Sequence, residues 1–314
     1  MMETASIKQV AIIGTGMIGS DVALYLAMRG LSPIMVGRTD ESVDRGLSRI
    51  RGNMKELVDE GVYNRQEGAH ITGRIDTAIS LDEAVLEADL VLEAVIEDLE
   101  VKQNLFAALE KAVPNHAVLA SCTSGLSPND IGEQCKRSEN IMVTHFWNPP
   151  YLVPLVELVA HDNASDRVKE KLITFLESLG KKPVLLKRDI LGHIGNRLQH
   201  AMFREAAELM DRGVAGAEEI DRVVKYGFGP RYSRIGPMEY VDSVGLDLQV
   251  AIESYLFEAL SAAKKPQKPL TDRYDAGNLG MKTGKGFYDW NKRDPGELIR
   301  RKNREYIIRL EQEW

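Results

Sequence analysis

The spacing of apolar residues divides the chain into two parts. Over the first 188 residues, short apolar runs predict buried strands at 8–14, 32–37, 88–95, 116–122, 139–146, 154–160 and 182–187. Between these runs, apolar residues recur at helical spacing over 19–30, 40–62, 100–113 and 165–180. Strands that alternate with helices predict a mostly parallel sheet covered by helices on both faces.

From about Asp189 onward the pattern becomes helical, over 192–213, 216–227 and 254–264, with no convincing strand between these segments. A chain of 314 residues is long enough for two domains with separate cores. We therefore predict an α/β fold: a doubly wound sheet domain over residues 1–188, followed by an all-α domain over residues 189–314.

Composition and charge narrow the class of partner. The net charge is −7, and the aromatic residues are not interleaved with basic runs, so nucleic acid and anionic membranes are disfavoured as partners. No apolar run is long enough to span a bilayer, and the N-terminus lacks a secretion signal. The two cysteines, Cys122 and Cys135, have no metal-binding spacing. These features predict a reduced, cytoplasmic protein without a metal site.

The first strand is followed by a glycine motif typical of dinucleotide binding. In "VAIIGTGMIGS", Gly14, Gly16 and Gly19 form G-x-G-x-x-G directly between a strand and a helix, with Met17 and Ile18 between the last two glycines. The first glycine permits the tight turn, the second lets a pyrophosphate approach, and the third allows close helix–strand packing. The helix N-terminus attracts the phosphate charge. The motif thus predicts a Rossmann-type domain that binds NAD(P).

The tip of the second strand, "PIMVGRTDES", lacks the acid that usually holds the ribose of NAD. Gly37 stands at that place, and Arg38 and Thr39 follow it. A missing carboxylate leaves room for a 2′-phosphate, which an Arg guanidinium binds well. The sequence modestly favours NADP. The alternative is a solvated surface Arg, with NAD held by the other contacts.

A His and a Glu in the middle of the chain have the character of a catalytic base and its partner. His145 ends a predicted strand, and Glu157 lies in the apolar run of the next strand, where an unpaired carboxylate would be costly. The two could meet across a hairpin, with imidazole as the base for an alcohol proton. Ser124 and Asn196 are further polar candidates. The structural alternatives are a packing His and capping Ser and Asn residues.

Over nearly its whole length the sequence resembles the 3-hydroxyacyl-CoA dehydrogenase family. The matching segments include "AIIGTGMIGS", "ADLVLEAVIEDLEVKQNLFAALEKAV", "ASCTSGLSP", "HFWNPPYLVPLVELV", "GNRLQHAMFREAAELMDRG", "IGPMEYVDSVGLD" and "KTGKGFYDW". The resemblance implies hydride transfer between a 3-hydroxyacyl substrate and nicotinamide, and a homodimer formed through the helical domain. It also implies roles for individual residues: His145 as base, Glu157 as its carboxylate partner, Ser124 and Asn196 around the substrate oxygen, and Glu97 and Lys102 on the cofactor side.

Departures from the family pattern bear on the substrate. Members that act on acyl-CoA commonly have Pro-Gly-Phe before the Asn, where this chain has Leu191, Gly192 and His193. The longer link "GFGPRYSRIGPMEY" resembles the branch with gulonate 3-dehydrogenase, lambda-crystallin and carnitine dehydrogenase, which implies a small free hydroxy acid. Arg231 in that link is a candidate clamp for its carboxylate.

Two rival functions remain open from the sequence. The segment "KTGKGFYDW" is typical of the acyl-CoA branch, and Arg49, Arg51 and Lys55 could hold the phosphates of CoA. A non-catalytic, crystallin-like nucleotide-binding protein is the rival from another class. The complete set of Ser124, His145, Glu157 and Asn196 argues against that rival.

Overall fold

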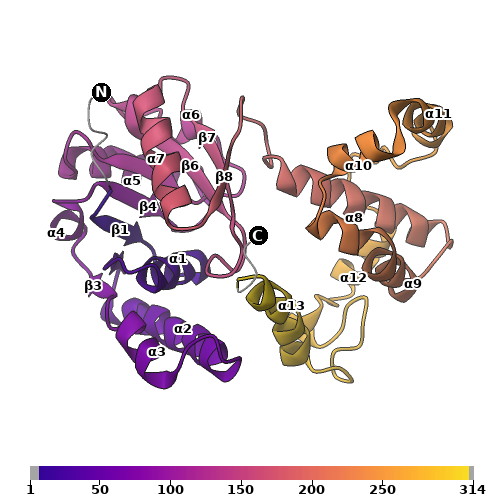
Figure 1. Cartoon of the computed structure of the whole chain (residues 1–314), viewed down its shortest axis with the longest axis horizontal. Coiled ribbons are helices and arrows are strands. Elements are labelled where there is room, and N and C mark those ends of the chain that lie inside the picture. The colour runs from indigo at the N-terminus through magenta and orange to yellow at the C-terminus, as the bar shows by residue number, and fades with distance from the viewer. Residues whose placement is uncertain (1–6, 311–314) are drawn as a thin grey trace. The chain divides into compact units, whose positions relative to one another are not determined.

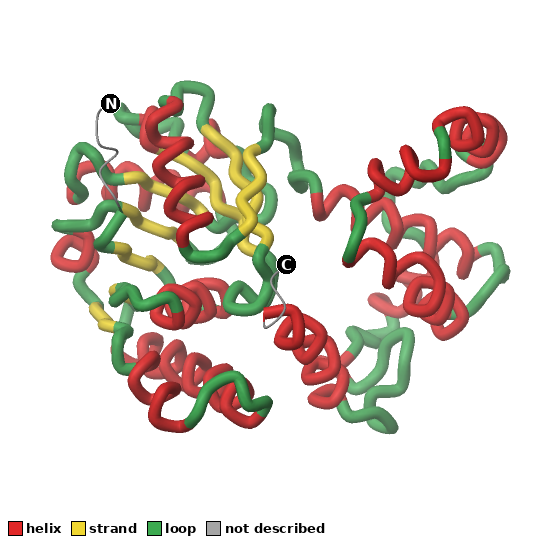
Figure 2. The backbone as a smooth tube through the Cα atoms, in the orientation of Figure 1, coloured by secondary structure: helices red, strands yellow, loops and turns green. Residues whose placement is uncertain are grey.

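The computed structural model describes residues 7–310, which form two compact units. Residues 7–194 together with 301–310 form the first unit, which we call the Rossmann unit. Residues 195–300 form the second, the helical unit. The change of pattern at Asp189 lies six residues before this boundary. All the strands belong to the Rossmann unit (Figure 2).

The Rossmann unit contains one eight-stranded sheet, in the order β3-β2-β1-β4-β5-β6-β7-β8. Figure 1 labels most of these strands. Neighbouring strands are parallel except for the antiparallel pair β6 and β7. Because the strand order reverses between β1 and β4, a cofactor crevice is expected at the carboxyl ends of these two strands. The strands are β1 Val10–Ile13, β2 Ile34–Val36, β3 Asp76–Ala78, β4 Leu90–Glu93, β5 Val118–Ser121, β6 Ile141–Phe146, β7 Leu155–Ala160 and β8 Lys182–Leu185.

Successive residues of the strands feed two separate apolar cores, one on each face of the sheet. In β1, Val10 and Ile12 pack with residues of α1 Met17–Met28, α2 Asp40–Asp59, α3 Arg65–Thr72 and α7 Asp166–Ser178. Ala11 and Ile13 pack with residues of α4 Leu81–Val85, α5 Leu99–Ala112 and α6 Pro128–Ile131. A short 3₁₀ turn, Ser138–Asn140, precedes β6. The predicted doubly wound α/β architecture is confirmed, whereas the sequence did not indicate α3, β3 or α4.

The helical unit consists of helices joined by loops, as predicted, and within 195–300 the only β pairing is a pair of isolated bridges at Lys285. The helix expected over 254–264 is wrong for most of its length, because the helix there ends at Leu256 and residues 257–264 form turns and loop. Its α-helices are α8 Gly195–Asp211, α9 Ala217–Val223, α10 Pro237–Val244, α11 Leu246–Leu256 and α12 Lys268–Asp275. A π-helical turn Val224–Phe228 and 3₁₀ turns Gly229–Ser233 and Met281–Thr283 complete the unit. Within residues 7–310, none of the helices has the length and apolar character needed to cross a bilayer.

The last helix, α13 Pro295–Leu310, begins in the helical unit and ends in the Rossmann unit. Ile307 joins the core beside α1 and α2, and Asn303 Nδ2 donates a hydrogen bond to Glu56 Oε1 at 2.9 Å. The exposed arginines and lysine of α13 therefore occupy only one of its faces. The other face returns the end of the chain to the Rossmann core, which sequence periodicity alone did not show.

Close to this contact, α1 carries a buried carboxyl group. Asp21 is 3% exposed and accepts a hydrogen bond from Asn53 Nδ2 at 2.7 Å. Burial raises the pKa of Asp21 to about 7, although Arg49 and the bond from Asn53 act in the opposite direction. The ionised form of Asp21 is thus disfavoured in the folded protein.

This burial predicts a pH-dependent stability. An unfolded Asp loses its proton near pH 4, whereas folded Asp21 keeps it up to about pH 7. The contribution of Asp21 to the free energy of unfolding is therefore fully present below pH 4 and is lost as the pH rises through 7. We expect Asp21→Asn, which still accepts the bond from Asn53, to raise the thermal midpoint at pH 8 and to change it little at pH 4. An equal change at both pH values would contradict the assignment.

Candidate active site

His145 and Glu157 face each other across the antiparallel pair β6 and β7. The strand register places them directly opposite one another. His145 Nδ1 lies 2.9 Å from Glu157 Oε2, and both side chains are buried. The contact expected from the sequence is therefore present in the fold.

A buried lysine donates hydrogen bonds to the turn between these two strands. The turn contains the cis peptide bond Asn148–Pro149. Lys181 Nζ donates hydrogen bonds to the carbonyl oxygens of Pro150 and Val153, at 2.5 and 2.7 Å, and lies 3.7 Å from the centre of the Tyr25 ring. These contacts tie the turn to β8 and α1, so the register of the hairpin does not depend on the two strands alone.

Two further N–H groups donate to Glu157. The indole Nε1 of Trp147 donates to Oε2 at 3.0 Å, and the backbone N–H of Ile194 donates to Oε1 at 2.8 Å. A carboxylate in an apolar strand pair is costly unless hydrogen bonds replace its hydration. With His145, these groups supply three donors. They come from β6, from the turn and from the segment before α8.

This arrangement gives the imidazole of His145 the character of a base. When Nδ1–H donates to the carboxylate of Glu157, the other ring nitrogen, Nε2, carries the lone pair. If Nε2 takes up a proton, the carboxylate stabilises the resulting imidazolium. The pair can therefore remove a proton from a hydroxyl group.

The glycine loop has a shape that fits a dinucleotide. A Cβ on Gly14 would lie 2.4 Å from the Ala94 carbonyl oxygen, and one on Gly19 would lie 2.0 Å from the Gly14 carbonyl oxygen. Gly14 also has a φ of 121°, which favours glycine. A Cβ on Gly16 would meet nothing within 4 Å, so this position is open just where α1 begins. Gly14 and Gly19 thus allow the chain to pack closely at the ends of β1 and β4. Gly16 leaves the helix N-terminus accessible to a phosphate.

Next to this loop, the tip of β2 has no room for a side chain at Gly37. A Cβ there would lie 2.6 Å from Ser42 Oγ and 2.7 Å from Val43 Cγ2. Thr39 caps α2, because its hydroxyl accepts the Ser42 N–H at 3.2 Å. Arg38 is exposed beside them. An acid at this position would therefore have to displace the side chains of Ser42 and Val43.

The carboxyl ends of β4 and β5 carry a buried ionic network. Lys102 is 1% exposed, and its Nζ lies 2.6 Å from Glu93 Oε1 and 3.4 Å from Glu97 Oε2. Ser121 Oγ donates to Glu93 Oε2 at 2.6 Å, and Glu97 Oε1 accepts the N–H of Ser124 at 3.1 Å. The network fixes the loop that presents Ser124. Sequence reasoning missed Glu93, for which the only signal was a Glu that ends an otherwise apolar strand.

The candidate residues are divided between the two units. The Rossmann unit contains most of them: the glycine loop, the tip of β2, Glu97, Lys102, Ser124, His145 and Glu157. Asn196 lies in the first turn of α8, and Arg231 lies in the 3₁₀ turn Gly229–Ser233, both in the helical unit. The Arg231 guanidinium carbon lies 4.5 Å from the centre of the Tyr240 ring, a cation–π contact that orients the side chain.

Comparison with known proteins agrees with this geometry. The family model described as the 3-hydroxyacyl-CoA dehydrogenase NAD binding domain matches residues 9–190, and that of the 3-hydroxyacyl-CoA dehydrogenase C-terminal domain matches residues 192–290. The chain belongs to the 3-hydroxyacyl-CoA dehydrogenase family. It is accordingly an oxidoreductase with an NAD-binding Rossmann domain and a helical C-terminal domain.

Relatives in this family differ in their substrates. The 3-hydroxybutyryl-CoA dehydrogenase of Bradyrhizobium diazoefficiens is 33% identical over 292 residues, which cover 93% of this chain and 98% of the relative. The 5-formyl-3-hydroxy-2-methylpyridine 4-carboxylate 5-dehydrogenase of Mesorhizobium japonicum is 28% identical and covers 90% of each chain. A crystal structure of an enzyme of the latter name, described as an NAD+ dependent dismutase, has a TM-score of 0.88 at 27% identity. It covers 98% of this chain and 99% of its own.

The ionic network predicts a large difference between two lysines. We expect Lys102→Met to lower the free energy of unfolding by about 3–5 kcal/mol, because it leaves the charge of Glu93 buried without its cation. Lys55→Met is the control: its ion pair with Asp59 is exposed, and its loss should cost at most about 0.5 kcal/mol. Urea unfolding of both variants measures the difference. Similar losses for the two would show that Lys102 is not the counter-charge of Glu93.

Proposed function

We propose that the protein is an NAD(P)-dependent dehydrogenase that oxidises a 3-hydroxy acid or 3-hydroxyacyl compound to the 3-oxo compound. We favour a small free hydroxy acid as the substrate. The observation that carries the proposal is the buried pair His145–Glu157, in which Nδ1 and Oε2 are 2.9 Å apart. The open helix N-terminus at Gly16 supports the cofactor assignment.

In the proposed reaction, His145 Nε2 accepts the proton of the substrate hydroxyl, while a hydride leaves the carbon that bears this hydroxyl. A bound nicotinamide cofactor supplies the hydride acceptor. Glu157 stabilises the imidazolium through Nδ1, and its other donors hold it in place. We assign Ser124 and Asn196 to the oxygen of the substrate, where hydrogen-bond donors stabilise the developing carbonyl. The residues of the chain thus orient the substrate and transfer its proton.

The preference for a small carboxylate has two supports. A relative with a TM-score of 0.88 over 98% of this chain is named for a pyridine carboxylate and not for a thioester. Arg231 is conformationally restrained by Tyr240, and a guanidinium can bind a carboxylate through two parallel hydrogen bonds. We propose Arg231 as that clamp. This assignment matches the branch of gulonate 3-dehydrogenase, lambda-crystallin and carnitine dehydrogenase that the sequence resembles.

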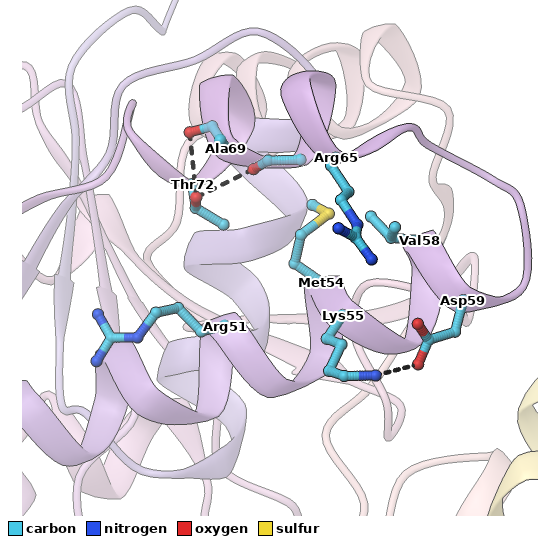
Figure 3. A pocket seen from close by; sticks show the side chains of 9 residues that line it. Arg51, Met54, Lys55, Val58, Asp59, Arg65, Ala69 and Thr72 are labelled. Carbon is cyan, nitrogen blue, oxygen red and sulfur yellow. Dashed lines mark hydrogen bonds and ion pairs between the residues drawn. The ribbon is translucent and has the colours of Figure 1, made fainter.

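A CoA thioester is the second candidate substrate, because a basic pocket lies between α2 and α3. The pocket has a volume of about 320 Å³, and Arg51, Lys55 and Arg65 line it (Figure 3). Lys55 pairs with Asp59, and the Arg51 guanidinium points away from the other two cations in this view. Arg49, grouped with Arg51 and Lys55 from the sequence, lines a different hollow. The pocket offers cations to phosphates, but they do not converge on one point.

For the cofactor, we propose a preference for NADP over NAD. Gly37 leaves no carboxylate to repel a 2′-phosphate, and Arg38 is exposed beside it. The N-terminus of α2, capped by Thr39, adds a favourable dipole for an anion. Asp40 and Glu41 in the first turn act against this, so Arg38 has to supply most of the preference.

We also propose a homodimer formed through the helical unit. Within residues 195–300, all of them described, only Ala207 and Pro269 are buried. Large apolar side chains are exposed throughout the unit, among them Leu198, Phe203, Met238, Leu246, Tyr255 and Phe257. Exposed apolar surface on this scale is typical of a protein interface, and a second copy of the chain would cover it.

The role of His145 is tested by His145→Gln. We expect turnover to fall by about 10²–10⁴-fold, because the substrate hydroxyl loses its base. The Kd for the reduced cofactor should stay within about twofold, since the glycine loop is unchanged. Steady-state kinetics and a fluorescence titration measure the two quantities. A variant that keeps most of its turnover would refute the proposed base.

The cofactor preference is tested by titrating the protein with NADPH and NADH. We expect NADPH to bind more tightly. Arg38→Ala should weaken NADPH roughly tenfold or more and leave NADH unchanged, because a charged hydrogen bond contributes about 1.5–3 kcal/mol. Arg45→Ala, which removes an exposed cation on the first turns of α2, is the control for general charge effects. Equal affinity of the wild-type protein for both cofactors would show that Arg38 does not select NADP.

A further inference from the structure

Trp147, the residue that follows β6, lies on the same side of the sheet as the proposed base. Side chains two residues apart on a strand project to the same face, so His145 and Trp147 share one. Glu157 stands directly opposite His145 in the β6–β7 register, which makes it the diagonal neighbour of Trp147. An aromatic side chain can span such a diagonal, and the indole Nε1 donates to Glu157 Oε2 at 3.0 Å. The geometry of the strand pair therefore directs the indole to the carboxylate.

The indole shares its acceptor with the imidazole. His145 Nδ1 lies 2.9 Å from the same atom, Oε2, whereas the N–H of Ile194 reaches the other oxygen, Oε1, at 2.8 Å. The ring centres of His145 and Trp147 are 5.9 Å apart, and the ring planes are inclined by 59°, so the two rings converge on the oxygen without stacking. One carboxylate oxygen thus receives two ring N–H groups. The imidazole can change its charge, and the indole cannot.

The backbone that carries the indole is fixed independently of Glu157. Trp147 is the first residue of the turn between β6 and β7. In the same turn, Lys181 Nζ binds the carbonyl oxygens of Pro150 and Val153, and Lys181 is 2% exposed. The donor is therefore held in place by the fold before any proton moves.

A permanent donor on Oε2 weakens the hold of the pair on a proton. The positive end of the indole N–H dipole points at the oxygen that would stabilise an imidazolium at His145, and it offsets part of the negative charge of Glu157. In a buried site such an interaction is screened little by water. The pair therefore takes up a proton at a lower pH than it would without the indole, whichever of the two side chains carries that proton. A base has to be free of its proton before each turnover, so the indole extends the working range to lower pH.

No neighbouring charge reproduces this effect. Within the described residues, the titratable side chains in contact with His145 are Glu157 from β7 and His193 from the segment before α8, whose ring centre is 5.1 Å away. Burial lowers the pKa of His193 from 6.5, and His145 lowers it further, whereas Glu157, the Thr123 backbone and Asp189 act in the opposite direction. The His193 ring is therefore neutral above pH 6.5.

We propose that Trp147 is a positioning residue for the reaction, whose indole N–H holds Glu157 Oε2 next to His145 and lowers the proton affinity of the pair. The inference rests on the proposed function, since it concerns the base of that reaction. It adds a residue that sets the lowest pH at which this base is ready to act.

The test separates the N–H group from the ring. Trp147→Phe removes the donor, and benzothienylalanine at position 147 keeps the shape of the indole with sulfur in place of the N–H. Trp290→Phe, which removes an indole of the helical unit, is the matched control. Two midpoints are measured for each protein. One is that of the acidic limb of kcat/KM for oxidation, and the other is that of the protonation of His145, followed by NMR of labelled histidine. The His145 signal is identified by its loss in His145→Gln.

We expect both replacements at position 147 to raise both midpoints by about 0.5–1 pH unit, which is roughly 3–10-fold in proton affinity, because a hydrogen bond to a charged group is lost. Trp290→Phe should leave both midpoints unchanged. A slower reaction with unmoved midpoints would mean that Trp147 only packs in the site. A shift for Phe without a shift for benzothienylalanine would assign the effect to the ring. Either result overturns the proposal.

The NMR titration distinguishes this inference from the proposed function. If His145→Gln keeps most of its turnover, the proposed function fails, and this inference fails with it. If that variant is inactive and the NMR midpoint moves for neither replacement at position 147, His145 stands as the base, and only the role of Trp147 is overturned.

Discussion

The carboxylate of Glu157 is the constraint on which the rest of the site depends. It lies in an apolar strand, where its charge can be buried only if N–H groups surround it. Those groups come from His145, Trp147 and Ile194, three separate points along the chain. A shift of one residue in the β6–β7 register would turn His145 away from Glu157 and leave the charge unpaired. The same hydrogen bonds therefore select the fold and orient the proposed base.

A second buried charge organises the cofactor side in the same way. Glu93 ends β4 beside the crevice and is neutralised by Lys102, while Glu97 continues the network to the loop of Ser124. Glu93 is the last residue of β4 and His145 the last but one of β6, so both networks lie near the carboxyl ends of parallel strands, where the loops that follow these strands begin. The protein thus uses buried ion pairs to fix the loops at the ends of these strands.

Local patterns explain what the sequence could predict. The long apolar strands, the glycine loop and the hairpin that joins His145 and Glu157 follow from period, spacing and chain order. β3 was missed because Asp76–Ala78 is short, polar and mostly exposed, so no apolar run marks it. The pairing of Lys102 with Glu93 and the return of α13 to the Rossmann core were also missed. Each of these depends on a partner brought close only by the fold.

If Glu157 makes His145 an effective base, Glu157→Gln should abolish most of that effect. Gln keeps the volume and can still accept the N–H of Trp147, but it cannot stabilise an imidazolium. In single-turnover experiments on the best substrate, we predict that hydride transfer slows by about 10²–10⁴-fold, with the cofactor Kd unchanged. A rate within a few-fold of the wild-type value would contradict the claim.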